Sequence, residues 1–160
     1  FQKHKKLSTS DQIKSITHPT IKIPEEIFIP EEYIDDLDLR LSIYKRISNI
    51  KNIEELSNLM IELIDRFGDI PKQLNNLFNL IEIKILSIKY NIEQLEFSRK
   101  GIVIGFYKNQ PTNPEKLLNL SLNKNDHYSL RPDQKIFYDF RGYLDDDRFK
   151  LAKKIIFEIK

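Results

Sequence analysis

EELSNLMIELIDRFGDIP, residues 54–71, contains the clearest helix pattern of the chain. Asn52 precedes it as a capping residue, and Glu55 stands three residues later, which is the spacing of a capping box. Gly68 supplies the positive-φ residue that ends many helices, and Pro71 opens the next apolar pattern. The spacing predicts a helix whose buried stripe consists of Ile53, Leu56, Met60, Leu63 and Phe67.

The polar side of this predicted helix is acidic. Residues three or four apart share a helix face, which groups Glu55, Asn58, Glu62, Asp65 and Asp69 on one face that we expect to lie opposite the buried stripe. Glu62 and Arg66 stand in the order that favours an i, i+4 ion pair, worth only about 0.2–0.5 kcal/mol. Paired-carboxylate catalysis needs a pocket that raises a pKa, and an exposed helix offers none. A solvated face and a docking surface are the two remaining interpretations.

Upstream, the pattern predicts a second helix and an extended segment. The apolar residues Leu37, Leu41, Tyr44 and Ile47 recur at helical spacing over residues 37–47. Before them, IKIPEEIFIPEEYI (21–34) places two prolines between short β-prone pieces and predicts a strap that crosses another surface. We therefore expect a strap followed by a helix.

Residues 1–20 have no lasting apolar period. Lysines stand among Ser, Thr and Gln there, at positions 3, 5, 6 and 14, which is typical of a flexible linker. Because the chain begins with Phe1 instead of Met, we expect this linker to follow an upstream part of a longer protein.

Downstream, the period changes from helix to strand and back. The apolar residues after Pro71, from Leu74 to Ile88, predict a long helix that is central and contacted from more than one side. Period-two alternation in QLEFSRKGIVIGFY (94–107) predicts a hairpin. A short helix over 114–122, two strands around Pro132 and a closing helix over 145–159 follow. This order predicts an α+β domain over 21–160, with helices on a small, mainly antiparallel sheet.

The composition excludes several classes of function. The 160 residues carry a net charge of only +2, so no strong field draws the whole molecule onto DNA or anionic lipid. Cysteine is absent, which excludes disulfides and thiol chemistry and fits the cytoplasm. No apolar run approaches the roughly 20 residues that span a bilayer, so we expect no membrane association.

Motifs for chemistry are weak. Four scattered glycines fit neither a phosphate loop nor a dinucleotide fingerprint, and His4, His18 and His127 are far apart in sequence, so we interpret them as exposed or hydrogen-bonded. The aspartate clusters 35/36/38 and 145/146/147 could collect Mg²⁺ for phosphodiesterase chemistry, but both stand at predicted helix starts, where they complement the helix dipole. We expect no catalytic, cofactor-binding or metal-binding residue.

Three blocks carry a family resemblance: IPEEYIDDLDLRLSIYKRIS (29–48), EELSNLMIELIDRFGDIP (54–71) and GIVIGFYKNQPTNPEKLLNL (101–120). In order and spacing they resemble the carboxy-terminal domain of the bacterial transcription-repair coupling factors, the Mfd family. The resemblance covers about Ile21 to Lys160. Its most specific pieces are Ile29-Pro30 before Tyr33-Ile34, the run from Arg40 to Tyr44, and the run from Glu62 to Gly68 with Pro71.

The resemblance implies a multidomain cytoplasmic ATP-dependent DNA translocase that removes stalled RNA polymerase and recruits nucleotide excision repair through UvrA. The motor, with its ATP and Mg²⁺, would lie upstream, so the resemblance implies no cofactor and no catalysis in this chain. It also implies that the domain packs against an amino-terminal module similar to part of UvrB, where it covers the UvrA-binding surface and restrains the motor. Glu62 and Asp65 would meet basic residues of that module, with Glu55, Arg66 and Asp69 completing the interdomain site.

Two alternatives stay open. The chain could be an accessory domain that contacts nucleic acid or RNA polymerase through its basic linker. It could also be a metal-dependent phosphodiesterase that uses the aspartate clusters.

Overall fold

The fold comes from a computed structural model that describes residues 18–124, 126–144 and 146–160. Its sheet has five strands in the order β1-β2-β3-β5-β4. β1 pairs parallel with β2, and the other neighbours are antiparallel, as the sequence predicted for most of the sheet. The strands are β1 (Thr20–Lys22), β2 (Ile92–Phe97), β3 (Gly101–Phe106), β4 (Tyr128–Leu130) and β5 (Ile136–Asp139).

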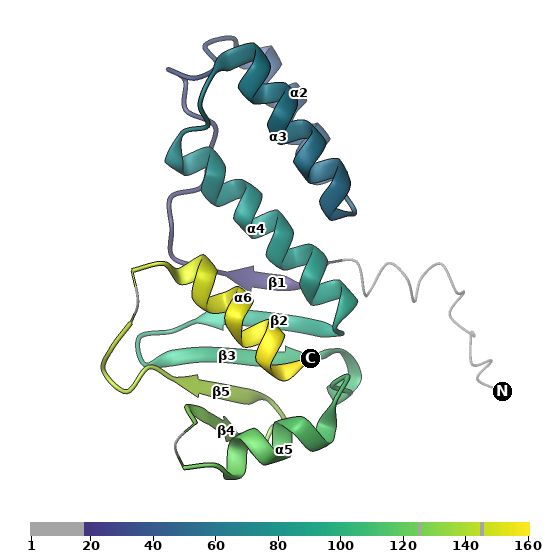
Figure 1. Cartoon of the computed structure of the whole chain (residues 1–160), viewed down its shortest axis with the longest axis vertical. Helices are drawn as coiled ribbons and strands as arrows, with labels where there is room; N and C mark the ends of the chain where they lie inside the picture. Colours follow the sequence, from purple (N-terminus) through teal and green to yellow (C-terminus); the bar gives the residue numbers. More distant parts are fainter. Residues whose placement is uncertain (1–17, 125, 145) are drawn as a thin grey trace, which may run out of the picture.

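The described residues also form five α-helices: α2 (Leu37–Ser48), α3 (Ile53–Phe67), α4 (Lys72–Lys89), α5 (Pro114–Leu122) and α6 (Arg148–Ile159). A short 3-10 turn, η1 (Tyr107–Asn109), links β3 to the segment before α5. Figure 1 shows α2 and α3 at one end of the molecule, the sheet with α6 at the other, and α4 between them. The α+β prediction is therefore confirmed.

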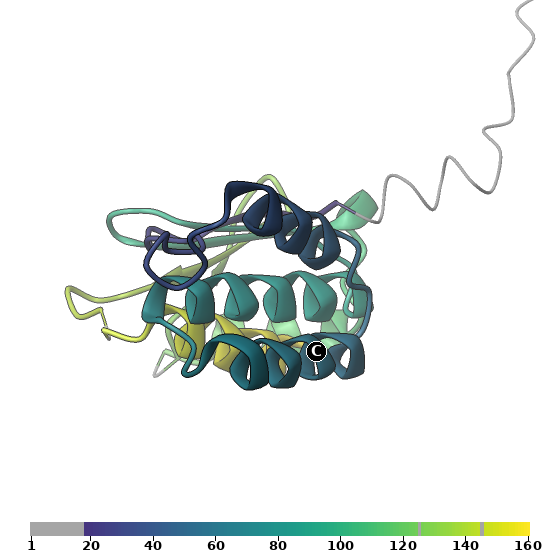
Figure 2. The ribbon, with the colours of Figure 1, turned by 90° about the horizontal axis from the view of Figure 1, so that it is seen from above.

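α4 belongs to two hydrophobic cores. Its first half contributes Leu74 and Phe78 to a cluster with α2, α3 and the segment before α2. Its second half contributes Ile83 to a larger cluster with the sheet and α6. Seen from above, α4 runs between α2 and α3 (Figure 2). The prediction of a central helix contacted from more than one side is confirmed.

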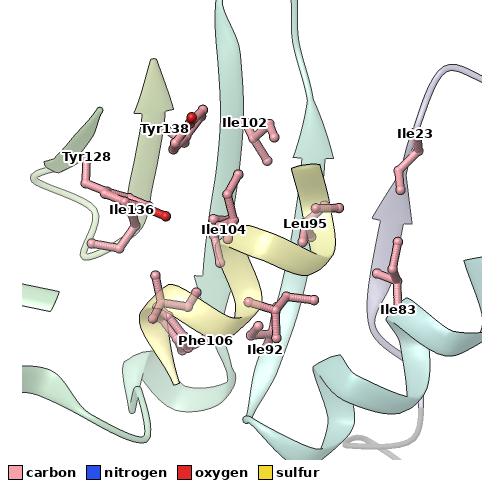
Figure 3. Packing of buried hydrophobic residues seen from close by; sticks show 14 of the residues in the cluster. Ile23, Ile83, Ile92, Leu95, Ile102, Ile104, Phe106, Tyr128, Ile136 and Tyr138 are labelled. Carbon is pink, nitrogen blue, oxygen red and sulfur yellow. The ribbon is translucent and has the colours of Figure 1, made fainter. Parts of the chain in front are cut away.

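The larger core lies on one face of the sheet. Figure 3 shows Leu95, Ile104 and Ile136 on neighbouring strands near α6. Leu95 stands opposite Ile104 in the register, and Ile104 stands opposite Ile136, so period-two alternation puts all three on one face. All three are buried.

The predicted strap crosses the helical end of the molecule. The Asn76 amide of α4 donates to the Glu26 carbonyl at 3.0 Å, and the Tyr44 hydroxyl of α2 accepts from the Ile29 N–H at 2.6 Å. The Tyr33 hydroxyl donates to the Leu63 and Gly68 carbonyls, at 3.1 and 2.9 Å. The strap therefore fixes the relative positions of α2, α3 and α4.

Two details differ from the predicted pattern. In α2 the buried residues are Ile43 and Ile47, whereas Leu37 and Leu41 are 59% and 56% exposed. The helix is turned because its inner side must face the core that it shares with α3 and α4. β1 begins at Thr20, inside the segment expected as linker. Residues 1–17 lie outside the described part of the chain, so the linker stays a prediction.

Candidate interaction surface

α3 begins and ends where its sequence predicts. The Asn52 side chain accepts from the Glu55 N–H at 2.8 Å, and the Glu55 carboxylate accepts from the Lys51 N–H at 3.1 Å. These bonds satisfy amides that a helix start leaves open. Gly68 ends the helix with a φ of 88°, which favours glycine. Glu55, one of the predicted site residues, therefore already serves as part of the cap.

The buried side of α3 differs from the prediction. Leu56, Leu59 and Leu63 are buried, whereas Ile53 is 41% exposed. The sequence pattern included Ile53 and missed Leu59, because two overlapping apolar stripes run along this helix and only its neighbours decide which one faces the core.

The acidic residues consequently do not all lie opposite the core. Residues two positions apart on a helix point to nearly opposite sides, so the residue opposite Leu59 and Leu63 is Ile61. Ile61 is 60% exposed. By the same spacing Asp65 lies opposite Leu63 and Asn58 lies opposite Leu56, whereas Glu62 is half-buried directly beside Leu63. The prediction that the acidic face is opposite the buried stripe therefore holds only in part.

Glu62 faces α2 and is held by two arginines. Its carboxylate accepts from both terminal nitrogens of Arg46, at 2.9 and 2.5 Å, and from Arg66 at 3.3 Å. The predicted i, i+4 pair with Arg66 is thus confirmed. The hydrogen bonds from Arg46 lower the pKa of Glu62, with a further contribution from Arg66. Its negative charge is largely compensated within the domain.

Asp65 and Asp69 are exposed, and no ion pair to either is found among the described residues. The pKa of the Tyr33 phenol is raised, first by burial and second by the negative charge of Asp69. A shallow hollow between α2 and α3 brings Glu55, Asn58 and Glu62 together with Arg46, Ile50 and Leu59. The predicted helical residues therefore lie along one side of α3, and Asp69 follows just after its end. Asp65 and Asp69 are exposed charges that no described basic side chain compensates.

In each of the two aspartate clusters, one aspartate caps a helix. Asp36 accepts from the Leu39 N–H at 2.8 Å at the start of α2, and Asp147 accepts from the Lys150 N–H at 2.9 Å at the start of α6. Asp145 lies outside the described residues. Within 18–124, 126–144 and 146–160, no three His, Asp or Glu side chains come together as metal ligands would.

Of the two histidines in the described residues, one is exposed and the other is hydrogen-bonded. The His127 ring stacks on Tyr138, with ring centroids 4.9 Å apart, and its Nδ1 lies 2.6 Å from the Asp139 carbonyl oxygen, as expected for a hydrogen-bonded histidine. His18 is exposed, and His4 falls outside the described residues. In the part of the chain that the structure describes, no helix combines the length and apolar character needed to cross a bilayer.

Comparison with known proteins places this geometry in a family. The family model described as TRCF domain matches residues 23–117. The transcription-repair-coupling factor of Rickettsia conorii is 39% identical over 120 residues, covering 75% of this chain and 11% of that protein. The Escherichia coli transcription-repair-coupling factor is 34% identical over 123 residues, covering 77% of this chain and 10% of that protein. The chain thus spans about a tenth of the length of these relatives.

A solved structure shares the fold. The crystal structure of the C-terminal domain of a transcription-repair coupling factor superposes with a TM-score of 0.69 at 20% identity, covering 89% of this chain and 91% of that one. At that identity the likeness concerns the fold alone. The family model supplies the sequence match, since residues 23–117 include most of the strap, α2, α3, α4 and the hairpin. The chain belongs to the TRCF domain family.

Proposed function

We propose that this chain is a regulatory, autoinhibitory domain of a transcription-repair-coupling factor. In this proposal the parent protein is a cytoplasmic ATP-dependent DNA translocase that displaces stalled RNA polymerase and recruits nucleotide excision repair. The domain packs through α3 against the amino-terminal UvrB-like module of the same protein and covers the surface that binds UvrA. ATP and Mg²⁺ belong to the upstream motor, so this domain needs no cofactor and catalyses no reaction.

The observation that carries the proposal is a pair of uncompensated carboxylates, Asp65 on the exposed side of α3 and Asp69 just after the end of that helix. Glu62 beside them is oriented by Arg46 and Arg66. Charges at the edge of an interface set its orientation and exclude wrong partners more than they add affinity. Tethering within one chain gives even a modest contact a high effective concentration. Such a contact opens when another ligand binds the open state more tightly.

The test is charge reversal in the full-length parent protein. Asp65→Lys with Asp69→Lys is expected to increase UvrA binding and the basal ATPase rate, because like charges then face each other across the closed contact. Glu93→Lys is the matched control, since Glu93 is an exposed carboxylate on β2, away from α3. Unchanged UvrA binding and unchanged ATPase in the double variant contradict the proposal.

The alternative, contact with nucleic acid or RNA polymerase, depends on lysines 3, 5, 6 and 14. These residues lie outside the described part of the chain, so that function stays a prediction from the sequence.

A further inference from the structure

Three isoleucines form an exposed stripe along α3. Ile53, Ile61 and Ile64 are 41%, 60% and 45% exposed, and Ser57 fills the position between Ile53 and Ile61. Successive steps of four, four and three residues keep all four on one helix face. We call these residues, Ile53, Ser57, Ile61 and Ile64, the isoleucine stripe.

The stripe has two different edges. On one side it continues into Met60 and Phe67, which are half-buried against the core. On the other side stand Glu54 and Asp65, because Asp65 follows Ile61 by one helical turn and Glu54 precedes it by two. Both carboxylates are exposed, and in the described residues neither has an ion-pair partner. Carboxylates therefore line one edge of the stripe only.

A purely solvated helix face does not explain this stripe. Burying apolar surface is worth roughly 25 cal/mol per Å², so each exposed isoleucine leaves that stabilisation unused. β-Branched isoleucine is also a poorer helix former than lysine or glutamate, so isoleucine gains α3 nothing at solvated positions. A covered state accounts for both observations.

The charges identify the kind of surface that covers the stripe. An anionic lipid surface repels the carboxylate edge. The same stripe of a second copy presents carboxylates and no cationic edge. A protein surface with an apolar centre and lysine or arginine along one side matches both the isoleucines and the carboxylates.

We propose that the isoleucine stripe is the centre of the docking contact of this domain, and that its partner surface is apolar with a basic edge facing Asp65 and Glu54. The inference rests on the proposed function in one respect: it takes the amino-terminal module of the parent protein as the part that presents this partner surface. Affinity comes from the isoleucines, and the carboxylates fix the orientation. The contact consequently persists at high salt, where exposed charge pairs are screened.

The test uses the full-length parent protein at about 0.1 M and about 1 M salt. UvrA binding and basal ATPase are compared with those of the unsubstituted parent at each salt concentration. Ile61→Ser with Ile64→Ser is expected to strengthen UvrA binding at least about tenfold at both, because central apolar anchors dominate interfaces. Asp65→Asn is expected to strengthen UvrA binding at the lower salt concentration only. Ile61→Leu with Ile64→Leu should preserve the closed state.

The control variant is Leu118→Ser with Leu122→Ser, two leucines of α5 that are 50% and 71% exposed at the other end of the molecule (Figure 1). It should leave both readouts unchanged. Thermal unfolding of this chain, followed by circular dichroism, shows whether each serine variant keeps its fold.

The outcomes separate the two proposals. If Asp65→Lys with Asp69→Lys opens the parent but the isoleucine variant does not, the stripe is not the docking centre, and the proposed function stands. If neither variant changes UvrA binding or ATPase, both proposals are wrong. If the isoleucine variant instead changes only the sedimentation of this chain, the stripe binds a second copy, and the inference is overturned.

Discussion

At the scale of single residues, Arg46 and Glu62 join two helices of the candidate surface. The two terminal nitrogens of the guanidinium each donate to one oxygen of the carboxylate, at 2.9 and 2.5 Å. This two-point geometry fixes direction as well as distance. The side chains are 46% and 37% exposed, so the pair stabilises the fold only modestly. Its main effect is to hold α2 and α3 at one relative position, which also places Asp65.

A double-mutant cycle measures this pair. For Arg46→Gln and Glu62→Gln, we expect a coupling of about 0.5–1 kcal/mol at neutral pH in denaturant unfolding of this chain. The pKa of Glu62 is lowered in the folded state, so the stabilisation is present above the unfolded carboxyl pKa, about 4.3, and is lost as the pH falls through the folded value. The coupling should therefore shrink as the pH is lowered below about 4.

The control cycle replaces Arg46→Gln by Arg66→Gln. Arg66 makes one longer contact of 3.3 Å to the same carboxylate, so its coupling should be smaller. Equal couplings for both arginines, or a coupling that does not change with pH, contradict the role given to Arg46.

At the scale of elements, β3 depends on a glycine. A Cβ added at Gly101 would lie 2.1 Å from the Tyr138 carbonyl oxygen and 2.5 Å from the Phe137 ring. Gly101→Ala should therefore lower the free energy of unfolding by roughly 2–3 kcal/mol, because strand β5 must move to admit the methyl group. Denaturant titration of this chain measures the change.

Gly105→Ala on the same strand is the matched control. Its nearest neighbour would be the flexible Gln94 side chain at 3.3 Å, so only a small change is expected. If the two alanine variants are equally stable, the close packing of β3 against β5 is not what requires Gly101.

α3 shows how far sequence reasoning reaches within an element. Its caps, Asn52 and Gly68, are local signals, and the structure confirms them. The rotation of α3 about its own axis is not determined locally. Either Leu59 or Ile53 can face the core, and packing against α2 and α4 determines which of them does. The isoleucine stripe was missed for the same reason, although the excess of isoleucine over the residues needed for one buried stripe was a signal.

At the scale of the whole molecule, α4 connects the two cores and so couples the helical end to the sheet. The sequence predicted this position from the wide apolar face of α4, and the structure confirms it. It did not predict that β1 pairs with β2, because Ile21 and Leu95 meet across a long separation in sequence. Partners of this kind depend on topology, which periodicity does not encode. Contacts with another module also depend on the surface of that module, so this sequence alone does not predict them.

The central claim is that the exposed side of α3 is covered in the parent protein. Its most direct test is carbodiimide labelling of the carboxylates on this side of α3 and just after its end. Labelling rates of Asp65 and Asp69 are compared between this chain alone and the full-length parent, with exposed Glu93 as internal reference. We predict strong protection of both aspartates in the parent, lost when UvrA binds, with no change at Glu93. Labelling of Asp65 and Asp69 in the free parent as fast as in the isolated chain would contradict the account.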